Sequence, residues 1–365
     1  MISTWNSRRT SMKRTFAKML FCIVASAMVV SQTSSGAWSE QKDPVKILYG
    51  HFDPPSSAFA PAVNKWAKEL EEKTKGRIKV ETSWGIGKTG EIYDLTTRGI
   101  IDVGFCVPSF SPGQFPVSDI TGLPYIVPTA EVGSRALMEF ARRGYLEKEF
   151  ADVKVLHYNT TQADTLFTKS KLVTKVDELK GMKIFGGGPV QQRRIKLMGA
   201  IPVQVPFPDL YSSVQKGILD GYIMGWAVMD AFKLFEITRY ATEPPSGTGT
   251  IAVVMNKNKW KQLPHSIQGI IDAMSEKYCI EYARAWDAAC ERGKQLFLNA
   301  GGQLVQWAPG ELDRVSDLIM PVWNEWIAER EKKGLPAKKA VEDFYAILKD
   351  LGVENPGVGY SRGDR

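Results

Sequence analysis

The pattern of hydrophobic and polar positions alternates between two periods along the chain after residue 44. Short apolar runs, typical of buried strands, are separated by segments whose apolar residues recur every three or four positions, typical of helices. In the first part of the chain this gives, in order, Val45–Tyr49, Ala58–Lys73 with Ser56 or Ser57 as its cap, Ile78–Thr82, Glu91–Arg98 and Ile101–Phe105. The order strand, helix, strand, helix, strand predicts a parallel sheet covered by helices.

A second unit of the same kind runs from Leu179 to Gly221. Lys183–Phe185 is predicted to be a strand edge, Gly186–Gly188 a turn, and Pro189 the first residue of a helix, where a missing amide hydrogen costs nothing. The helix is expected to end at Gly199. A ligand at the end of this strand would meet bare backbone and a helix N-terminus, an arrangement that favours an anion.

The C-terminal third of the chain is predicted to be helical. One periodic stretch from Ser266 to about Ala300 contains no proline and would be about 52 Å long at 1.5 Å per residue. A helix of that length can bridge two lobes. A short strand at Gln303–Gln306 and helices at Glu311–Lys333 and Ala337–Asp350 are expected after it.

Two polar segments, Asn159–Asp164 and Pro244–Gly249, predict crossings between lobes. We therefore expect an α/β fold of two lobes, with a ligand cleft between them and the long C-terminal helix bridging them. Residues 44–158 are assigned to the first lobe, with 250–285 returning to it. Residues 159–249 are assigned to the second, with 286–350 packing on it and bridging, and residues 351–365 to a loose tail.

The first 37 residues are predicted to be a secretory signal. Five basic residues precede an apolar run, Met19–Val30, and the small and polar residues after it end at Ala37. The run is too short for a permanent membrane span, and a retained N-terminal anchor is the weaker alternative. Without this segment the formal net charge falls from +7 to +2, so the basic composition is no argument for nucleic-acid binding.

The remaining composition, 44% hydrophobic and 24% charged in 365 residues, is typical of a soluble globular protein. Cys106, Cys279 and Cys290 and three scattered histidines give neither a disulfide framework nor metal-ligand spacing. The Gly-Lys-Thr at 87–89 lacks the glycine that a phosphate-binding loop needs at position 82. No motif of nucleophile and base is present. We predict no metal, no cofactor and a binding rather than a catalytic role.

The segment LKGMKIFGGGPVQQRRIKLMGAIPVQVPFPDLYSSVQKGILDG at 179–221 resembles the extracytoplasmic solute-binding proteins of tripartite ATP-independent periplasmic (TRAP) transporters, of the C4-dicarboxylate-binding type. The similarity extends over most of the chain after the signal, including the Lys73–Ile78 turn, the Gly99–Asp102 strand entry and the long helix. It implies a two-lobed protein of the periplasm that closes over a small solute and delivers it to the membrane permease subunits of a TRAP transporter. We expect a monomer whose two lobe crossings act as hinges.

The sequence departs from that family at several positions that bind the solute. Such proteins usually carry an arginine directly after Lys-Ile, which pairs with the solute carboxylate, and here that position is Phe185. A second arginine often follows the lobe crossing, where this chain has Asp164 and Thr165, and the expected asparagine falls near Met224. Apolar side chains in place of a guanidinium predict an organic acid with a large apolar or aromatic part, whose carboxylate meets another donor.

The candidate ligand-binding residues are Phe185, Gly187, Arg194, Tyr222, Met224, Trp226, His51, Phe110 and Thr165. The carboxylate donor is expected among the glycine-loop amides, Arg194 and His51. Phe185, Tyr222 and Trp226 have a plain core role as their alternative, and Arg194 a solvated or lobe-bridging role. No nucleic-acid partner is expected. The alternative functions are a ligand-sensing periplasmic module for a membrane receptor and, less favoured, an exported enzyme on a similar scaffold.

Overall fold

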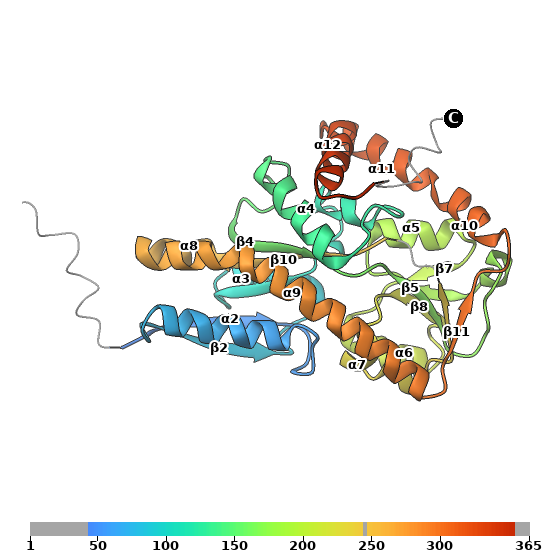
Figure 1. Cartoon of the computed structure of the whole chain (residues 1–365), viewed down its shortest axis with the longest axis horizontal. Helices are drawn as coiled ribbons and strands as arrows, with labels where there is room; N and C mark the ends of the chain where they lie inside the picture. The colour runs from blue at the N-terminus through green and yellow to red at the C-terminus, as the bar shows by residue number, and fades with distance from the viewer. Residues whose placement is uncertain (1–42, 244–246, 355–365) are drawn as a thin grey trace, which may run out of the picture. The chain divides into compact units, whose positions relative to one another are not determined.

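The computed structural model describes residues 43–243 and 247–354 (Figure 1). The expected signal segment, Pro244–Ser246 of the second predicted crossing, and residues 355–365 of the expected tail lie outside the described residues. The chain divides into two compact units, Met1–Val45 and Lys46–Arg365, and everything described below except the first residue of β1 belongs to the second unit.

The first sheet contains five strands in the order β2-β1-β3-β10-β4. The predicted parallel pairing is confirmed for β1 and β3, whereas β10 runs antiparallel to both β3 and β4 and makes the sheet mixed. Every residue of β10 is buried, which suits a strand placed between two others. The bounds are Val45–His51 for β1, Ile78–Trp84 for β2, Val103–Cys106 for β3, Val153–Thr160 for β4 and Thr250–Asn256 for β10.

The second sheet contains six strands in the order β11-β9-β5-β8-β6-β7. Its bounds are Thr165–Thr168 for β5, Lys183–Phe185 for β6, Ile201–Val203 for β7, Gly221–Met224 for β8, Tyr240–Glu243 for β9 and Gln303–Gln306 for β11. β6 is followed by α5, which starts at Pro189 as predicted, and β6 pairs in parallel with β7 and β8. β8 ends at Met224, so the site candidate Tyr222 lies in this strand and Trp226 lies beyond its end.

The C-terminal third is helical, as predicted, but one predicted helix is two. The long helix α9 spans His265–Asn299, whereas the stretch expected to run from Glu311 to Lys333 breaks at Pro321, whose ring cannot continue the preceding turn. The α2 helix starts at Ala60, two residues later than expected. The other bounds are Ala60–Lys73 for α2, Ile92–Thr97 for α3, Ala130–Arg142 for α4, Pro189–Leu197 for α5, Leu210–Gln215 for α6, Val228–Ala231 for α7, Lys257–Gln262 for α8, Glu311–Ile319 for α10, Pro321–Glu331 for α11 and Ala337–Asp350 for α12.

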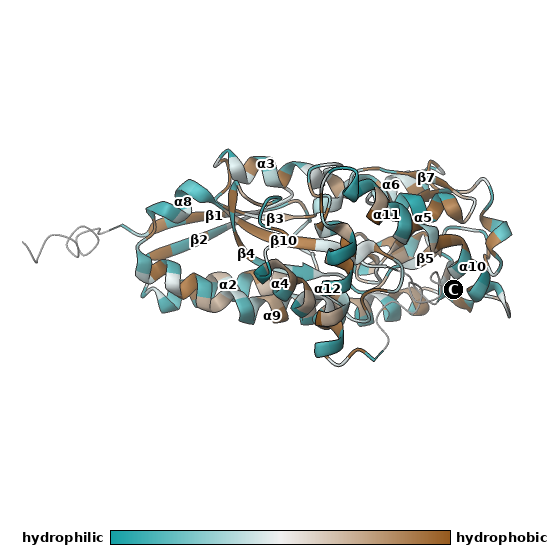
Figure 2. Ribbon diagram, turned by 90° about the horizontal axis from the view of Figure 1, so that it is seen from above, coloured by the Kyte–Doolittle hydropathy of each residue, from teal (hydrophilic) through white to brown (hydrophobic). Residues whose placement is uncertain are grey.

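The helix α9 bridges the two lobes, as predicted, and Figure 1 shows it in orange running from the first sheet towards the second. It packs on α2, α4 and β4 in the first lobe and on α7 in the second. The side chains of Tyr278, Tyr282 and Trp286 in its middle are buried. In Figure 2 the most hydrophobic ribbon lies in the strands that these helices cover. The C-terminal helices contact both lobes, because α11 packs on α5 and α12 packs on α4.

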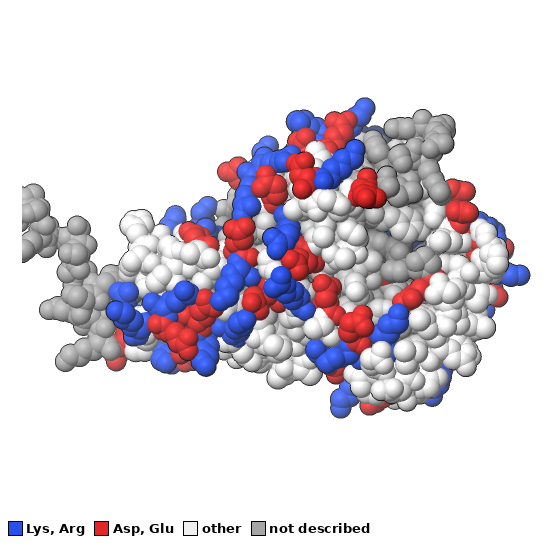
Figure 3. All heavy atoms as spheres, in the orientation of Figure 1, with Lys and Arg blue, Asp and Glu red and all other residues white. Residues whose placement is uncertain are grey.

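The outer face of α2 and α9 carries mixed charges rather than one sign, as Figure 3 shows along the diagonal of the molecule. Ion pairs join the two helices there, including Lys65 with Glu281 and Lys277 with Glu69. Such exposed pairs contribute little stability individually. Among the described residues, no helix is both long and apolar enough to cross a membrane.

Candidate ligand-binding site

A cavity of about 110 Å³ lies where the two lobes meet, and both lobes contribute to its lining. Most of its surface is apolar, because seven of its lining side chains are aromatic: Phe52, Phe59, Phe105, Phe110, Phe207, Phe232 and Trp286. An apolar hollow with a few convergent polar groups is the usual form of a small-molecule site.

The wall from the first lobe is built on the loop that follows β1. Phe59 stacks on Trp286 of α9 with ring centroids 5.1 Å apart, and it lies 4.6 Å from Phe105 of β3. Phe52 extends this group towards the second lobe, because its ring stacks on Phe207 at 5.9 Å. The rings pack on one another, so the wall is held in shape without a ligand.

The wall from the second lobe is the N-terminus of α5. Gly188, Pro189, Val190 and Gln191 line the cavity. The N-cap, Gly188, provides no side-chain cap, and among the described residues no acceptor is found for the amides of Val190 and Gln191. These donors and the positive end of the helix dipole make this end of the cavity suited to an anionic oxygen.

The two lobes approach each other closely at this helix end. A Cβ added at Gly188 would lie 2.5 Å from the Cβ of Ser109 in the first lobe, so only glycine fits there. The backbone crossings also hydrogen bond to each other, since the amide of Thr161 donates to Gly249 and that of Asp164 donates to Gly247. The two lobes are therefore closed over the cavity in this structure.

Asp164 lies on the cavity wall beside the first crossing and has a cationic partner. Its Oδ2 accepts from the Nη2 of Arg194 at 3.2 Å and from the Nε2 of Gln191 at 2.8 Å. Burial raises the pKa of the Asp164 carboxyl to about 7, and the charge of Arg194 opposes that rise. Gly247, with a positive φ of 77°, leaves the space that the Arg194 guanidinium fills, because a Cβ there would lie 2.6 Å from its Nη1.

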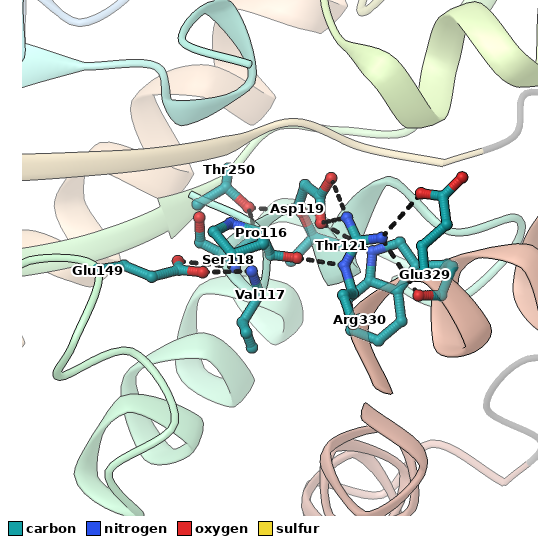
Figure 4. Close-up of polar contacts among 10 residues, drawn as sticks. Pro116, Val117, Ser118, Asp119, Thr121, Glu149, Thr250, Glu329 and Arg330 are labelled. Carbon is teal, nitrogen blue, oxygen red and sulfur yellow. Dashed lines mark hydrogen bonds and ion pairs between the residues drawn. The ribbon is translucent and has the colours of Figure 1, made fainter. Parts of the chain in front are cut away.

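Asp119 is a second cavity acid with a buried arginine, as Figure 4 shows. The Nη2 of Arg330 in α11 donates to both of its carboxylate oxygens at 2.9 and 2.8 Å, and the Nε donates to the carbonyl of Pro116. The Nε1 of Trp326 donates to Asp119 at 2.7 Å. Burial raises the pKa of Asp119 and these partners lower it. Arg330 thus fixes the short helix Ser118–Gly122, whose Thr121 and Gly122 line the cavity.

Asp53 is the third acid on the cavity wall and differs from the other two. Its side chain is 11% exposed, and Oδ2 accepts from the hydroxyl of Ser57 at 2.8 Å. No lysine or arginine pairs with it among the described residues. Its other neighbour, His51, is buried, which lowers the pKa of the imidazole to about 3 and keeps the ring neutral. Burial raises the pKa of the Asp53 carboxyl to about 7.

The structure brings three of the nine predicted site residues to the cavity lining: Gly187, Phe110 and Met224. Three others lie directly behind lining residues. Phe185 is buried behind Phe110 and Phe207, with ring centroids 6.4 and 5.7 Å away, His51 stacks on Phe105 at 4.1 Å, and Arg194 lies behind Asp164.

The remaining three predicted residues lie in the core of the second lobe. Tyr222 is buried and its hydroxyl lies 2.6 Å from that of Thr238, and Thr165 is buried in β5. The Nε1 of Trp226 donates to Glu243 at 3.3 Å. None of these three is among the residues that line the cavity.

Several lining residues were not predicted from the sequence. Asp53 lies in the loop that follows β1, two residues after His51, and its position after the first strand was the one available signal. Trp286 faces the cavity from the middle of α9, where the helical period marks it only as a buried position. Asp119 lies in a short helix. Its partner, Arg330, is distant in the chain, so no local sequence pattern indicates the pair. Among the described residues, no group of three metal-ligating side chains could hold a metal ion.

A two-lobed α/β protein with a ligand-sized cavity at the meeting of the lobes, and backbone crossings beside it, belongs by its architecture to the solute-binding proteins. The family comparison gives the assignment its particular form. The chain belongs to the bacterial extracellular solute-binding protein family 7, whose family description matches residues 49–330. The predicted family and the two-lobed fold are thereby confirmed.

Curated relatives are distant in sequence. The C4-dicarboxylate-binding periplasmic protein DctP of Rhodobacter capsulatus is 25% identical over 250 residues, which cover 64% of this chain and 72% of that protein. A solute-binding protein of Albidiferax ferrireducens is 24% identical over 287 residues, which cover 74% of this chain and 81% of that protein.

Solved structures are similar over nearly their whole length. A TRAP solute-binding protein of Rhodoferax ferrireducens, in complex with copurified benzoate, has a TM-score of 0.80 at 25% identity and covers 84% of this chain and 98% of its own. A marine metagenome protein specific for aromatic acid ligands, in complex with 3-hydroxybenzoate, has a TM-score of 0.81 at 26% identity, covering 84% and 99%. A Bordetella bronchiseptica protein with bound mandelate has a TM-score of 0.79 at 25% identity, covering 84% and 100%.

Proposed function

We propose that this protein captures an organic acid with an aromatic or alicyclic ring between its lobes and delivers it to the membrane permease of a TRAP transporter. The observation that carries the proposal is one cavity with a ring-lined body and a helix N-terminus at one side. The rings offer apolar area to a ring of the solute, and the free amides of α5 offer donors to its carboxylate.

The proposal places the protein in the periplasm, after removal of the predicted signal at residues 1–37. Two features of the chain support a role in capture rather than turnover. The three acids on the cavity wall include two that are held by buried arginines, and neither His51 nor His157 lines the cavity. The solved relatives that bind benzoate, 3-hydroxybenzoate and mandelate support a ring-bearing acid as the solute.

A thermal-shift panel tests the class of solute. Benzoate, mandelate, phenylacetate and cyclohexanecarboxylate are expected to raise the Tm of the ligand-free protein, because each fills the ring-lined cavity and reaches α5 with its carboxylate. Succinate and malate, which have no ring to bury, are expected to leave the Tm unchanged. Stabilisation by succinate or malate without any by the ring acids would refute the proposal.

Lobe closure is tested separately by small-angle scattering with a ligand taken from the panel. The crossings at Thr161–Asp164 and Gly247–Gly249 are proposed as the hinge, because they lie side by side and are joined by hydrogen bonds. The radius of gyration is expected to fall on saturation. An unchanged radius with a tight ligand would contradict closure while leaving the solute class untouched.

A further inference from the structure

Asp53 is the only one of the three cavity acids whose charge no described side chain balances. Asp119 has Arg330 and Asp164 has Arg194, with nitrogen to oxygen distances of 2.8 and 3.2 Å. For Asp53, the only donor to its side chain among the described residues is the Ser57 hydroxyl, which bonds Oδ2, and the carboxyl is partly exposed on the wall of the cavity. A carboxylate in this apolar wall is costly in its charged form, so it either takes up a proton, as its raised pKa shows, or is balanced by a cationic ligand.

His51 does not supply the missing charge. Its Nδ1 lies 3.8 Å from Oδ2 of Asp53, but that nitrogen accepts a hydrogen bond from the Asp53 amide at 3.1 Å. The imidazole proton is therefore on Nε2, which is buried and has no acceptor within the described part of the chain. A second proton on this ring would be enclosed by Phe52, Phe59 and Phe105.

The surroundings of Asp53 suit a cation from the solute. Phe52, Phe59, Phe105 and Trp286 line the cavity on the same wall, and the faces of such rings attract ammonium groups. A hydroxyl would satisfy Oδ1 with one hydrogen bond but would leave the buried charge in place. An ammonium group supplies both the donor and the opposite charge.

We propose that the solute carries an ammonium group as well as its carboxylate, and that Asp53 binds this ammonium group inside the ring-lined part of the cavity. The inference rests on the proposed function for its carboxylate end, because α5 takes that end in the second lobe. The solute is thus a ring compound with opposite charges at two ends, one for each lobe. Asp53 is a residue that determines specificity, and Asp164 and Asp119 are structural.

Isothermal titration with matched benzoates tests the inference on the full chain after the signal, refolded to remove bound solute. Three substituents of similar size are compared at the 3- and 4-positions: aminomethyl, hydroxymethyl and ethyl. The aminomethyl compounds are expected to bind about 10- to 100-fold more tightly than the ethyl compounds, which corresponds to one charge-assisted hydrogen bond. In Asp53→Asn this preference should disappear, whereas Asp317→Asn on the exposed face of α10 should keep it.

Benzylamine, an ammonium compound without a carboxylate, separates this inference from the proposed function. If benzylamine binds in an Asp53-dependent way and none of the benzoates binds, Asp53 takes the ammonium group but the solute is not an acid. A preference for the ethyl or hydroxymethyl compounds would overturn the inference, and so would an aminomethyl preference that survives Asp53→Asn. Failure of benzylamine and of both aminomethyl compounds to bind would also overturn it.

Discussion

The two walls of the cavity differ in whether a buried carboxylate has a cationic partner. On the wall beside the first crossing, Asp164 is held by Arg194, and a glycine at position 247 leaves room for the guanidinium. On the wall after β1, Asp53 is as deeply buried but has only a serine hydroxyl. The same residue type is therefore part of the scaffold in one place and available to a ligand in the other. What distinguishes them is the nearest cation rather than the acid itself.

The largest effect is expected from removing the cation that balances Asp164. Arg194→Met should cost about 3–5 kcal/mol of unfolding free energy at pH 8, because it leaves a buried carboxylate unpaired. The cost should shrink at pH 5, where Asp164 can take up a proton and lose its charge, since burial already raises its pKa. Urea denaturation at both pH values measures the difference.

The neighbouring arginine provides the matched control. Arg193 makes two hydrogen bonds of 2.6 Å to Glu325, but both side chains are more than a third exposed. Arg193→Met should therefore cost less than about 1 kcal/mol. Asp164→Asn should restore part of the stability of Arg194→Met. Equal losses for the two arginine variants would show that burial does not separate the pairs.

The next largest effect concerns Asp53, whose substitution should raise the unfolding free energy rather than lower it. The folded-state pKa of about 7 lies above the ordinary value of 3.8, so the native state holds a proton that the unfolded chain releases between these pH values. The stability that Asp53 contributes is thus present below about pH 4 and lost as the pH rises to 7. Asp53→Asn should be about 2–4 kcal/mol more stable than the parent at pH 9 and about equal to it at pH 4.

Thermal or urea unfolding of both proteins from pH 4 to 9 measures this difference as a curve. Taking the difference between the two proteins cancels the contributions of other titrating groups, such as Glu149, whose pKa burial also raises to about 7. The exposed Asp317→Asn should stay within about 0.5 kcal/mol throughout. A difference between Asp53→Asn and the parent that does not change with pH would mean that Asp53 has a cation partner in solution.

The difference between the two walls also shows which features could not be predicted from the sequence. Periodicity predicted α9 and the β6–α5 turn, because each depends on residues close in the chain. Glycine and proline gave the start of α5, and the polar segments at the crossings gave the two lobes, which the family resemblance also implies. Periodicity does not specify the direction of a strand, so the antiparallel pairing of β10 with β3 was not predicted.

The candidate site was harder to predict because its charges are balanced over long chain separations. Asp119 and Arg330 are 211 residues apart, and Asp164 and Arg194 are 30 apart. The substitution of Phe185 for an arginine indicated an apolar site, yet its own ring lies behind Phe110 and Phe207. Asp53 has no cationic partner within the described part of the chain, so only its burial beside the cavity identifies it.

The smallest effect at the cavity acids is expected from Arg330→Lys, which tests whether charge or geometry holds Asp119. Arg330 gives two hydrogen bonds to Asp119 and one each to the carbonyls of Pro116 and Trp326. Arg330→Lys keeps the charge but has no planar fork to match the carboxylate, so it should lose about 1–2 kcal/mol of unfolding free energy. Arg330→Met, which removes the charge, should lose about 3–5 kcal/mol.

The exposed Arg314 calibrates this comparison, because it also reaches both oxygens of one carboxylate, Asp177, at 2.8 and 2.7 Å, but is 47% exposed. Arg314→Lys should change the stability by less than about 0.5 kcal/mol, since water replaces the lost donors. If Arg330→Lys were as mild as Arg314→Lys, charge alone would hold Asp119. If it were as costly as Arg330→Met, the fork geometry would be what fixes the Ser118–Gly122 helix, and solute affinity should fall with it because Thr121 and Gly122 line the cavity.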